Sequence, residues 1–174
     1  SIVVEDRLAP TVITRSSPTI DLDENGEIIF DNSIEVQSLF SDGSSDNCSI
    51  DSFWVAPDYF DCSAIGSRNV ELFARDIHGN VSSQTTGITI RDVDDPVIVW
   101  QENIQLYLND DGFYVIDPEN DIDGGSYDNC ATIAVYETFP DTVFCSDVGD
   151  ISLTFNIIDA QGNSTNETRT VNVS

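Results

Sequence analysis

The sequence lacks lysine and methionine, and it has one histidine and six arginines against 32 aspartates and glutamates. The formal net charge is −26. Nucleic acids and anionic membranes bind basic surfaces, so neither is an expected partner. No apolar run reaches the ~18 residues of a membrane span, so we expect no membrane insertion. Hydrophobic residues make up 40% of the 174, which predicts a packed protein rather than a disordered chain.

Motifs for catalysis are missing as well. The sequence has no nucleophile elbow, phosphate loop or zinc-binding helix motif, and His78 stands in a turn-like segment. Residues 21–26 begin like an EF-hand loop, but the twelfth position is Asn32 instead of glutamate, so a hairpin is the better interpretation. We therefore expect no enzyme.

The four cysteines form two well-separated pairs, Cys48 with Cys62 and Cys130 with Cys145. The 13 and 14 residues between the members are too many for a C-x-x-C redox or zinc motif. We expect two local disulfides, each worth roughly 3 kcal/mol in the chain-entropy model, and an oxidising, extracellular environment. Four reduced core cysteines in a cytosolic protein are the alternative.

The chain is a tandem repeat. The matching positions are Pro10/Pro96, Leu22/Leu108 and Gly26/Gly112 at an offset of 86, Cys62/Cys145, Asp76/Asp159 and Asn80/Asn163 at 83, and Cys48/Cys130 at 82. Self-similarity at this period indicates an array whose unit is a whole domain, and it favours disulfides within each half. We expect domains at 10–91 and 96–174, with a linker at 92–95.

The start of the chain fits the same array. Residues 1–6 align with residues 87–92, which close the first repeat. We therefore expect residues 1–9 to be the end of a preceding repeat with its linker, and the chain to be a fragment of a longer array.

Within each repeat the hydrophobic residues alternate with a period of two, as in Val70-x-Leu72 and Leu153-x-Phe155. This pattern is typical of half-buried strands. The pairs at 25–26 and 111–112 are hairpin signals, Gly79-Asn80 with its counterpart marks a second tight turn, and no segment shows a helical stripe. About seven short strands per repeat predict an all-β protein of two tandem immunoglobulin-like β-sandwiches, each with one intradomain disulfide.

Carboxylates and amides concentrate in the linkers, in the loop before the first cysteine of each repeat, and in the second tight turn. Strand counting brings these three segments to the N-terminal pole of each domain. The candidate metal ligands are Asp6, Asp42, Asp46, Asp76, Asn80, Asp92, Asp94, Asp95, Asp123, Asp128, Asp159 and Asn163. Oxygen ligands from separate loops suit Ca²⁺, which takes six to eight oxygens. The alternative is that these are turn residues, because Asp, Asn, Gly and Ser dominate turns for backbone reasons.

The repeat resembles those of SprB-like gliding adhesins, giant cell-surface proteins of Bacteroidetes, and hyalin-type immunoglobulin-like repeats. The likeness rests on residues 10–13, 20–26, 41–50, 60–62 and 76–80, and in the second copy on 106–112, 125–130, 144–145 and 159–163. The second copy departs at residues 117–123, where extra acids replace a shorter loop.

The resemblance implies a secreted stalk segment at the cell surface, exported by the type IX route and serving adhesion or gliding motility. Neighbouring repeats are then the main partners, and calcium at the junctions would stiffen the array. The alternative is a module that binds surface glycans or another ligand of a cell surface, with Tyr59, Trp100 or Tyr127 stacking on a sugar.

Overall fold

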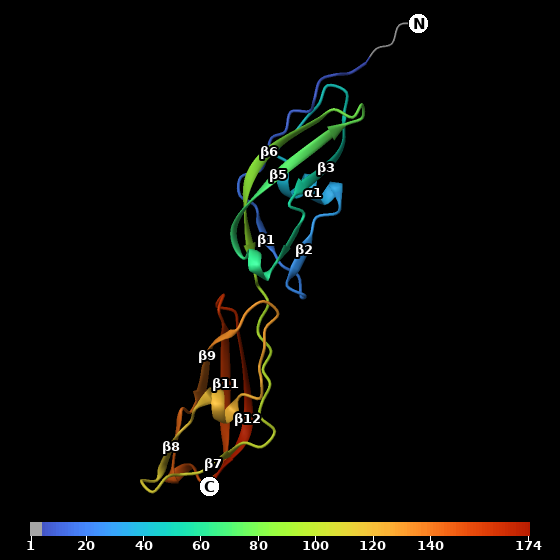
Figure 1. Cartoon of the computed structure of the whole chain (residues 1–174). Coiled ribbons are helices and arrows are strands. Elements are labelled where there is room, and N and C mark those ends of the chain that lie inside the picture. The colour runs from blue at the N-terminus through green and yellow to red at the C-terminus, as the bar shows by residue number, and fades with distance from the viewer. Residues whose placement is uncertain (1–4) are drawn as a thin grey trace. The chain divides into compact units, whose positions relative to one another are not determined.

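The computed structural model describes residues 5–174, which divide into two compact units with their boundary between Asp92 and Val93 (Figure 1). Each unit is built from short strands and two long ones. Residues 1–4, at the expected end of a preceding repeat, lie outside the described residues. No helix among the described residues is long and apolar enough to cross a membrane.

The first unit is a β-sandwich with a four-stranded sheet in the order β1-β6-β5-β3 and a two-stranded sheet of β2 and β4. Its elements are β1 (Thr19–Asp21), β2 (Glu27–Ile29), α1 (Ser33–Phe40), β3 (Ile50–Ala56), β4 (Tyr59–Asp61), the 3₁₀ turn η1 (Cys62–Ala64), β5 (Gly66–Asp76) and β6 (Val81–Arg91). Alternate residues of β5 point inward, so Val70, Leu72 and Ala74 are buried and their neighbours Glu71 and Arg75 are exposed.

A tight turn joins β5 to β6, as the Gly-Asn signal predicted. The N–H of Gly79 donates to the carbonyl of Asp76, and the N–H of Asp76 donates to the carbonyl of Asn80. Gly79 has a φ of 92°, which side chains other than hydrogen rarely allow. The turn therefore fixes the end of β5 and the start of β6 at one pole of the sandwich.

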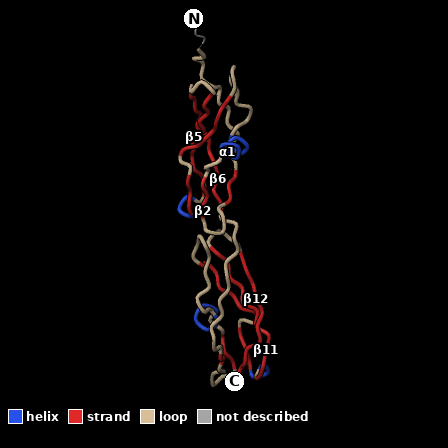
Figure 2. The backbone as a smooth tube through the Cα atoms, turned by 90° about the vertical axis from the view of Figure 1, so that its right-hand side faces the viewer, coloured by secondary structure: helices blue, strands red, loops and turns tan. Residues whose placement is uncertain are grey.

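The helix α1 is a correction, because no helix was expected. Asn32 caps it, with its side chain accepting from the N–H of Ile34, and Val36 and Phe40 bury their side chains one turn apart. Figure 2 shows α1 as a short helical segment among the strands of its unit. Two buried positions in eight residues make too short a stripe to distinguish a helix from a strand by periodicity.

The second unit repeats this plan with sheets β7-β12-β11-β9 and β8-β10. Its elements are β7 (Gln105–Leu106), β8 (Phe113–Val115), the π-helical turn η2 (Pro118–Ile122), β9 (Ile133–Phe139), β10 (Thr142–Phe144), the 3₁₀ turn η3 (Cys145–Asp147), β11 (Gly149–Asp159) and β12 (Ser164–Val173). Leu153, Phe155 and Ile157 of β11 are fully buried in its core.

The turns at Gly26 and Gly112 form, but they do not close hairpins of paired strands. The N–H of Gly26 donates to the carbonyl of Asp23, while β1 pairs with β6 and β2 pairs with β4. The turn thus carries the chain from one sheet to the other. The two immunoglobulin-like β-sandwiches are confirmed.

The predicted disulfides Cys48–Cys62 and Cys130–Cys145 are wrong. Cys48 and Cys145 carry free, exposed thiols, whereas Cys62 and Cys130 are disulfide-bonded. Cys48 lies just before Ile50, which pairs with Asp76 at one end of β5. The Cys62 sulfur lies 3.4 Å from the carbonyl oxygen of Gly26, at the other end of the unit.

The distance between the two ends explains this error. Eleven residues of β5 at ~3.3 Å each place the two cysteines roughly 30 Å apart, and a disulfide needs Cα atoms within about 7 Å. Cys130 and Cys145 are separated in the same way along β11, because Cys145 lies beside Gly112. Closeness in sequence did not mean closeness in space, since the intervening chain is extended.

Candidate metal centre

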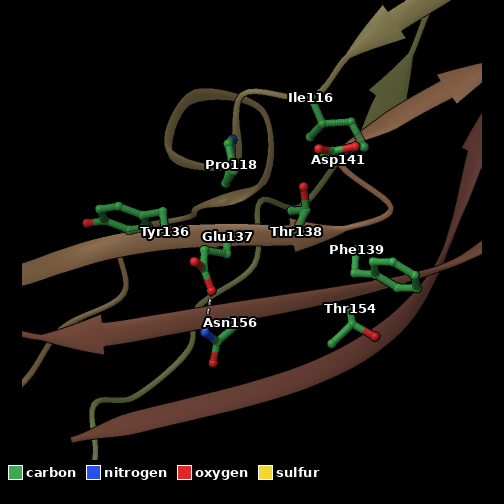
Figure 3. A pocket seen from close by; sticks show the side chains of 9 residues that line it. All are labelled: Ile116, Pro118, Tyr136, Glu137, Thr138, Phe139, Asp141, Thr154 and Asn156. Atoms are coloured by element: carbon green, nitrogen blue, oxygen red, sulfur yellow. Dashed lines mark hydrogen bonds between the residues drawn. The ribbon is translucent and has the colours of Figure 1, made fainter. Parts of the chain in front are cut away.

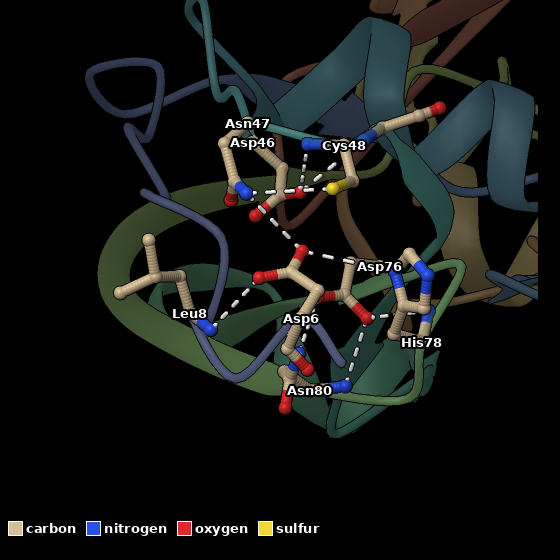
Figure 4. A network of polar contacts seen from close by, with 9 residues as sticks. Asp6, Leu8, Asp46, Asn47, Cys48, Asp76, His78 and Asn80 are labelled. Atoms are coloured by element: carbon tan, nitrogen blue, oxygen red, sulfur yellow. Dashed lines mark hydrogen bonds and ion pairs between the residues drawn. The ribbon is translucent and has the colours of Figure 1, made fainter. Parts of the chain in front are cut away.

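Three carboxylates meet at the N-terminal pole of the first repeat. One oxygen from each of Asp6, Asp46 and Asp76 lies within 4.8 Å of the others (Figure 4). We call this group the acidic pole of the first repeat. The three residues come from segments that are far apart in the sequence, so only the fold brings them together.

Sheet topology explains why these segments meet. Asp76 ends β5, and Asp46 stands in the loop that enters β3, whose Ile50 pairs with Asp76. Asp6 belongs to the segment before the first strand and is tied to the turn, because the side-chain amide of Asn80 donates to its backbone carbonyl at 3.2 Å. Linker, loop and turn thus converge as strand counting predicted.

Asp76 is the buried member, with 1% of its surface exposed. Its carboxylate accepts from the backbone N–H groups of His78 and Asn80 at 2.8 and 2.9 Å and from the Asn80 side chain at 2.7 Å. Burial works to raise the pKa of Asp76, but the hydrogen bonds from Asn80 and His78 outweigh it and lower the pKa. Asp76 is therefore ionised at neutral pH.

The two carboxylate oxygens of Asp46 differ in their hydrogen bonding. Its Oδ2 accepts from the backbone N–H groups of Cys48 and Ser49 at 2.8 and 3.2 Å. Its Oδ1 is buried and has no hydrogen-bond partner among the described residues. A buried carboxylate oxygen without a donor costs free energy, so this atom fits a site that receives a cation.

Asp6 completes the pole from the linker side. The hydrogen bond from the Cys48 thiol is the main reason why the pKa of Asp6 is lowered, and the same bond is the main reason why the pKa of Cys48 is raised. Oδ1 of Asp6 accepts from the N–H of Leu8, and Oδ2 lies 3.7 Å from Nδ1 of His78. Carboxylates beside one another repel, and a divalent cation would relieve that repulsion.

Two further side chains at this pole could bind a metal, and the sequence did not predict them. The thiol of Cys48 and a ring nitrogen of His78 lie within 4.8 Å of each other and of an Asp6 oxygen. Both residues are exposed, the His78 side chain by 41%. The only signal for them was that each stands within two residues of a predicted ligand.

The second repeat builds the same arrangement from its own residues. Asp128 and Asp159 offer carboxylate oxygens within 4.8 Å of one another. Oδ2 of Asp128 accepts from the N–H groups of Cys130 and Ala131, and its Oδ1 is again buried without a hydrogen-bond partner. Asp159 is 3% exposed and accepts from three backbone N–H groups and the Asn163 amide. The unsatisfied oxygen therefore recurs at matching positions.

The remaining predicted ligands divide into helpers, linker acids and outliers. Asn80 and Asn163 donate to the carboxylates and hold them in place. Asp94 accepts from the Asn129 amide at 2.7 Å, and Asp95 from the N–H of Ser164 at 3.3 Å. Asp92, the sequence counterpart of Asp6, is buried, with 6% exposed.

Two further predicted ligands lie outside the groups of neighbouring ligand atoms among the described residues. Asp42 is exposed and follows α1, and it belongs to none of the groups of neighbouring ligand atoms. Asp123 accepts from the N–H groups of Gly125 and Ser126, which makes it a turn residue. The turn interpretation therefore describes Asp123 well, whereas it leaves the unsatisfied oxygens of Asp46 and Asp128 unexplained.

The spacing of the acidic pole fits calcium. Calcium–oxygen distances are ~2.3–2.6 Å, so oxygens on opposite sides of one ion lie about 5 Å apart. The three oxygens of the acidic pole lie within 4.8 Å of one another, so they are close enough to contact one such ion. The three carboxylates suit Ca²⁺, whereas the neighbouring group of Asp6, the Cys48 thiol and the His78 ring contains the nitrogen and sulfur that zinc prefers.

The aromatic residues proposed for glycan stacking differ in exposure. Trp100 is 6% exposed, packs edge-on against Phe155 and donates from its indole nitrogen to Glu167, so it is a core residue and its proposed role in stacking is wrong. Tyr59 is 45% exposed and donates its hydroxyl to Glu27, and Tyr127 is 58% exposed.

Among solved structures, this chain shows similarity to protocadherin fragments and to fibronectin(III)-like modules. The human protocadherin-24 fragment EC1-2 is 13% identical, with coverage of 96% of this chain and 98% of that chain and a TM-score of 0.42. The fibronectin(III)-like modules of Clostridium thermocellum CbhA are 12% identical, with 94% of each chain covered and a TM-score of 0.35.

Longer fragments match as well. The PcdhgB3 fragment EC1-4 is 10% identical, with 95% of this chain covered and a TM-score of 0.40, but the chain spans only 50% of that fragment and 32% of a protocadherin gammaB4 extracellular domain. No protein-family model and no curated protein matches the sequence.

Proposed function

We propose that this chain is a non-catalytic pair of immunoglobulin-like repeats from the stalk of a secreted bacterial cell-surface adhesin, and that each repeat binds one Ca²⁺ at its N-terminal pole. The observation that carries the metal site is the buried, unpartnered Oδ1 of Asp46, which recurs at Asp128. The resemblance to SprB-like gliding adhesins supports the bacterial surface and the role in adhesion or gliding.

The physical argument for the ion starts from hydrogen bonding. The backbone N–H groups that donate to Asp46 are directed at Oδ2, Oδ1 is buried without a donor among the described residues, and one oxygen of Asp46 lies close to those of Asp6 and Asp76. A cation is the partner that satisfies this oxygen and neutralises Asp6 and Asp76 at once. Magnesium fits less well, because it retains several waters and takes few protein ligands.

The second site follows from the repeat. Asp128 and Asp159 correspond to Asp46 and Asp76, and Asp92 stands in the sequence where Asp6 stands in the first copy. We infer that Asp92 supplies the linker carboxylate of the second site. An ion held by both a linker residue and a repeat restricts the freedom of the linker, so calcium would stiffen a long array.

Thermal unfolding tests this function. Calcium in hundredfold excess over its dissociation constant stabilises a one-site domain by about 2.7 kcal/mol, which corresponds to a rise in Tm of roughly 10–20 °C for a domain of this size. We expect that rise in calcium relative to EDTA, and a much smaller one in magnesium at equal ionic strength. Asp46→Asn should remove it for the first repeat.

The matched control is Asp42→Asn, which removes the same charge from the same loop but lies outside the acidic pole. It should keep the full calcium response. Equal Tm values in calcium and EDTA, or equal losses in the two variants, would show that the acids are ordinary loop residues.

A further inference from the structure

The strand β9 forms one edge of the larger sheet of the second repeat. Antiparallel pairing with β11 uses the backbone groups of alternate residues, and those of the residues in between point away from the sheet. An open edge of this kind is a template for another strand unless something covers it. Two apolar side chains of β9 are also exposed, Val135 by 37% and Phe139 by 80%.

The first repeat covers the matching edge. Its edge strand β3 packs against α1, and the backbone N–H of Phe53, which points away from β5, donates to the hydroxyl of Ser33 at 2.7 Å. Val36 and Phe40 of α1 are fully buried. The helix thus occupies the place that a further strand would take.

The second repeat has the shorter turn η2 at this place in the sequence, and η2 also lies against β9, but none of its described residues supplies an acceptor for the outward N–H groups of that strand. Tyr136 corresponds to Phe53, so its N–H and that of Thr138 point to the open edge. No side chain of the described residues accepts a hydrogen bond from either N–H in the way that Ser33 does. The hydroxyl of Thr138 is also buried without a partner. This edge therefore has backbone and side-chain groups that remain to be satisfied.

A groove of about 510 Å³ lies along the same strand (Figure 3). Ile116, Pro118 and Tyr136 give it an apolar wall, and Phe139 stands at its exposed end. Its two charged residues, Glu137 and Asp141, are both acidic. Figure 3 shows Tyr136 and Thr138 on one side of β9 and Glu137 and Phe139 on the other, as strand geometry requires.

We propose that β9 is a docking edge for an extended peptide of a partner protein, which adds as a further strand and carries basic side chains opposite Glu137 and Asp141. Peptides recognised in this way gain affinity from main-chain hydrogen bonds and specificity from pockets for alternate side chains. The charge of the edge argues for a basic peptide. A second copy of this chain, with its own net charge of −26, would be repelled by the acidic edge.

A synthetic peptide of ten alternating lysine and valine residues tests the proposal, with fluorescence anisotropy of a labelled peptide measured against the whole chain at about 150 mM salt. The control peptide has the same sequence with alternate backbone nitrogens methylated, so charge and side chains are kept and the ladder is blocked. We expect at least tenfold weaker binding of the control. Hydrogen exchange should show protection of the Tyr136 and Thr138 amides by the unmodified peptide only.

Charge variants separate the edge from the general acidity of the chain. Glu137→Gln with Asp141→Asn should weaken binding of the lysine–valine peptide about threefold to tenfold, because exposed ion pairs are individually weak. Glu24→Gln with Asp58→Asn removes the same charge from exposed sites of the first repeat and should leave binding unchanged.

Several results would overturn the proposal. Equal binding of the two peptides would mean charge attraction alone, and protection at the β3 edge in place of β9 would put the site in the wrong repeat. Binding of a neutral oligosaccharide that perturbs Phe139 while the peptide gives no protection would make the groove a glycan site.

Discussion

The two repeats share the carboxylates at their N-terminal poles and differ in what covers the edge of the larger sheet. At the poles, Asp46 and Asp128 each accept hydrogen bonds from backbone N–H groups at one carboxylate oxygen. The other oxygen of each is buried without a donor in the described part of the chain. At the edge, an eight-residue helix stands in the first repeat and a five-residue π-helical turn in the second.

The outer face next to that edge changes too. Trp54 and Phe73 stack in parallel at 5.1 Å in the first repeat, and their counterparts Glu137 and Asn156 form a hydrogen bond at 3.0 Å in the second. The shared pole is built by turns and loops that any copy of the fold needs. The residues beside the sheet edge differ between the repeats, so the two repeats present different surfaces on the same fold.

The cysteines give the sharpest contrast between equivalent positions. Cys48 is free while its counterpart Cys130 is bonded, and Cys145 is free while its counterpart Cys62 is bonded. Alkylation of the denatured, unreduced chain followed by peptide mass spectrometry should label Cys48 and Cys145 fully and the other two only after reduction. Labelling of none or of all four would refute the assigned thiol states.

Core truncation should affect both repeats strongly. Leu72 and Phe155 are equivalent, and both are fully buried. Leu72→Ala should lower the free energy of unfolding by about 2–5 kcal/mol and Phe155→Ala by about 3–5 kcal/mol, because each leaves a cavity. Urea unfolding followed by circular dichroism measures this. The exposed Val148→Ala should stay within about 0.5 kcal/mol, and a core loss below about 1 kcal/mol would contradict the packing.

The turn aspartates should matter even without metal. Asp76→Ala and Asp159→Ala each remove a buried carboxylate that accepts from partly buried backbone N–H groups, so each should cost about 1–3 kcal/mol of unfolding free energy in EDTA. Working in EDTA keeps loss of calcium out of the comparison. Asp110→Ala, at an exposed turn, should have little effect; similar values for all three would deny these two carboxylates a structural role.

Two tyrosines should give the smallest effect. The hydrogen bond to Glu27 raises the pKa of Tyr59, and the one to Asp121 raises the pKa of Tyr114, above the usual value of about 10. Because the folded pKa is the higher one, each contributes stability below pH ~10 that is lost as pH rises through the folded pKa. Phenolate absorbance should show Glu27→Gln lowering the Tyr59 transition alone; an unchanged titration would mean that Glu27 is no partner.

The sequence predicted those features that depend on local pattern and on strand counting. Alternation located β5 and β11, and the Gly79-Asn80 pair marked the turn that places Asp76 beside Asp46. Counting strands then put Asp6 at the same pole.

Features that depend on tertiary partners could not be predicted in this way. The helix α1 buries only Val36 and Phe40, which are too few to reveal a period of 3.6 residues. Its packing against β3 is a tertiary contact that the local pattern does not show. A disulfide between Cys48 and Cys62 was predicted because the two are near in sequence, but the chain between them is extended and holds them apart. Asp123 shares its residue type with Asp128, and only the direction of its hydrogen bonds shows that it serves a turn.

Calcium stoichiometry tests the central claim most directly. Isothermal titration of the metal-free chain with calcium chloride should give two ions per chain, one ion for Asp46→Asn, one for Asp128→Asn and none for the double variant. The account would be contradicted by a wild-type chain that takes up no calcium, or by a double variant that still binds two ions.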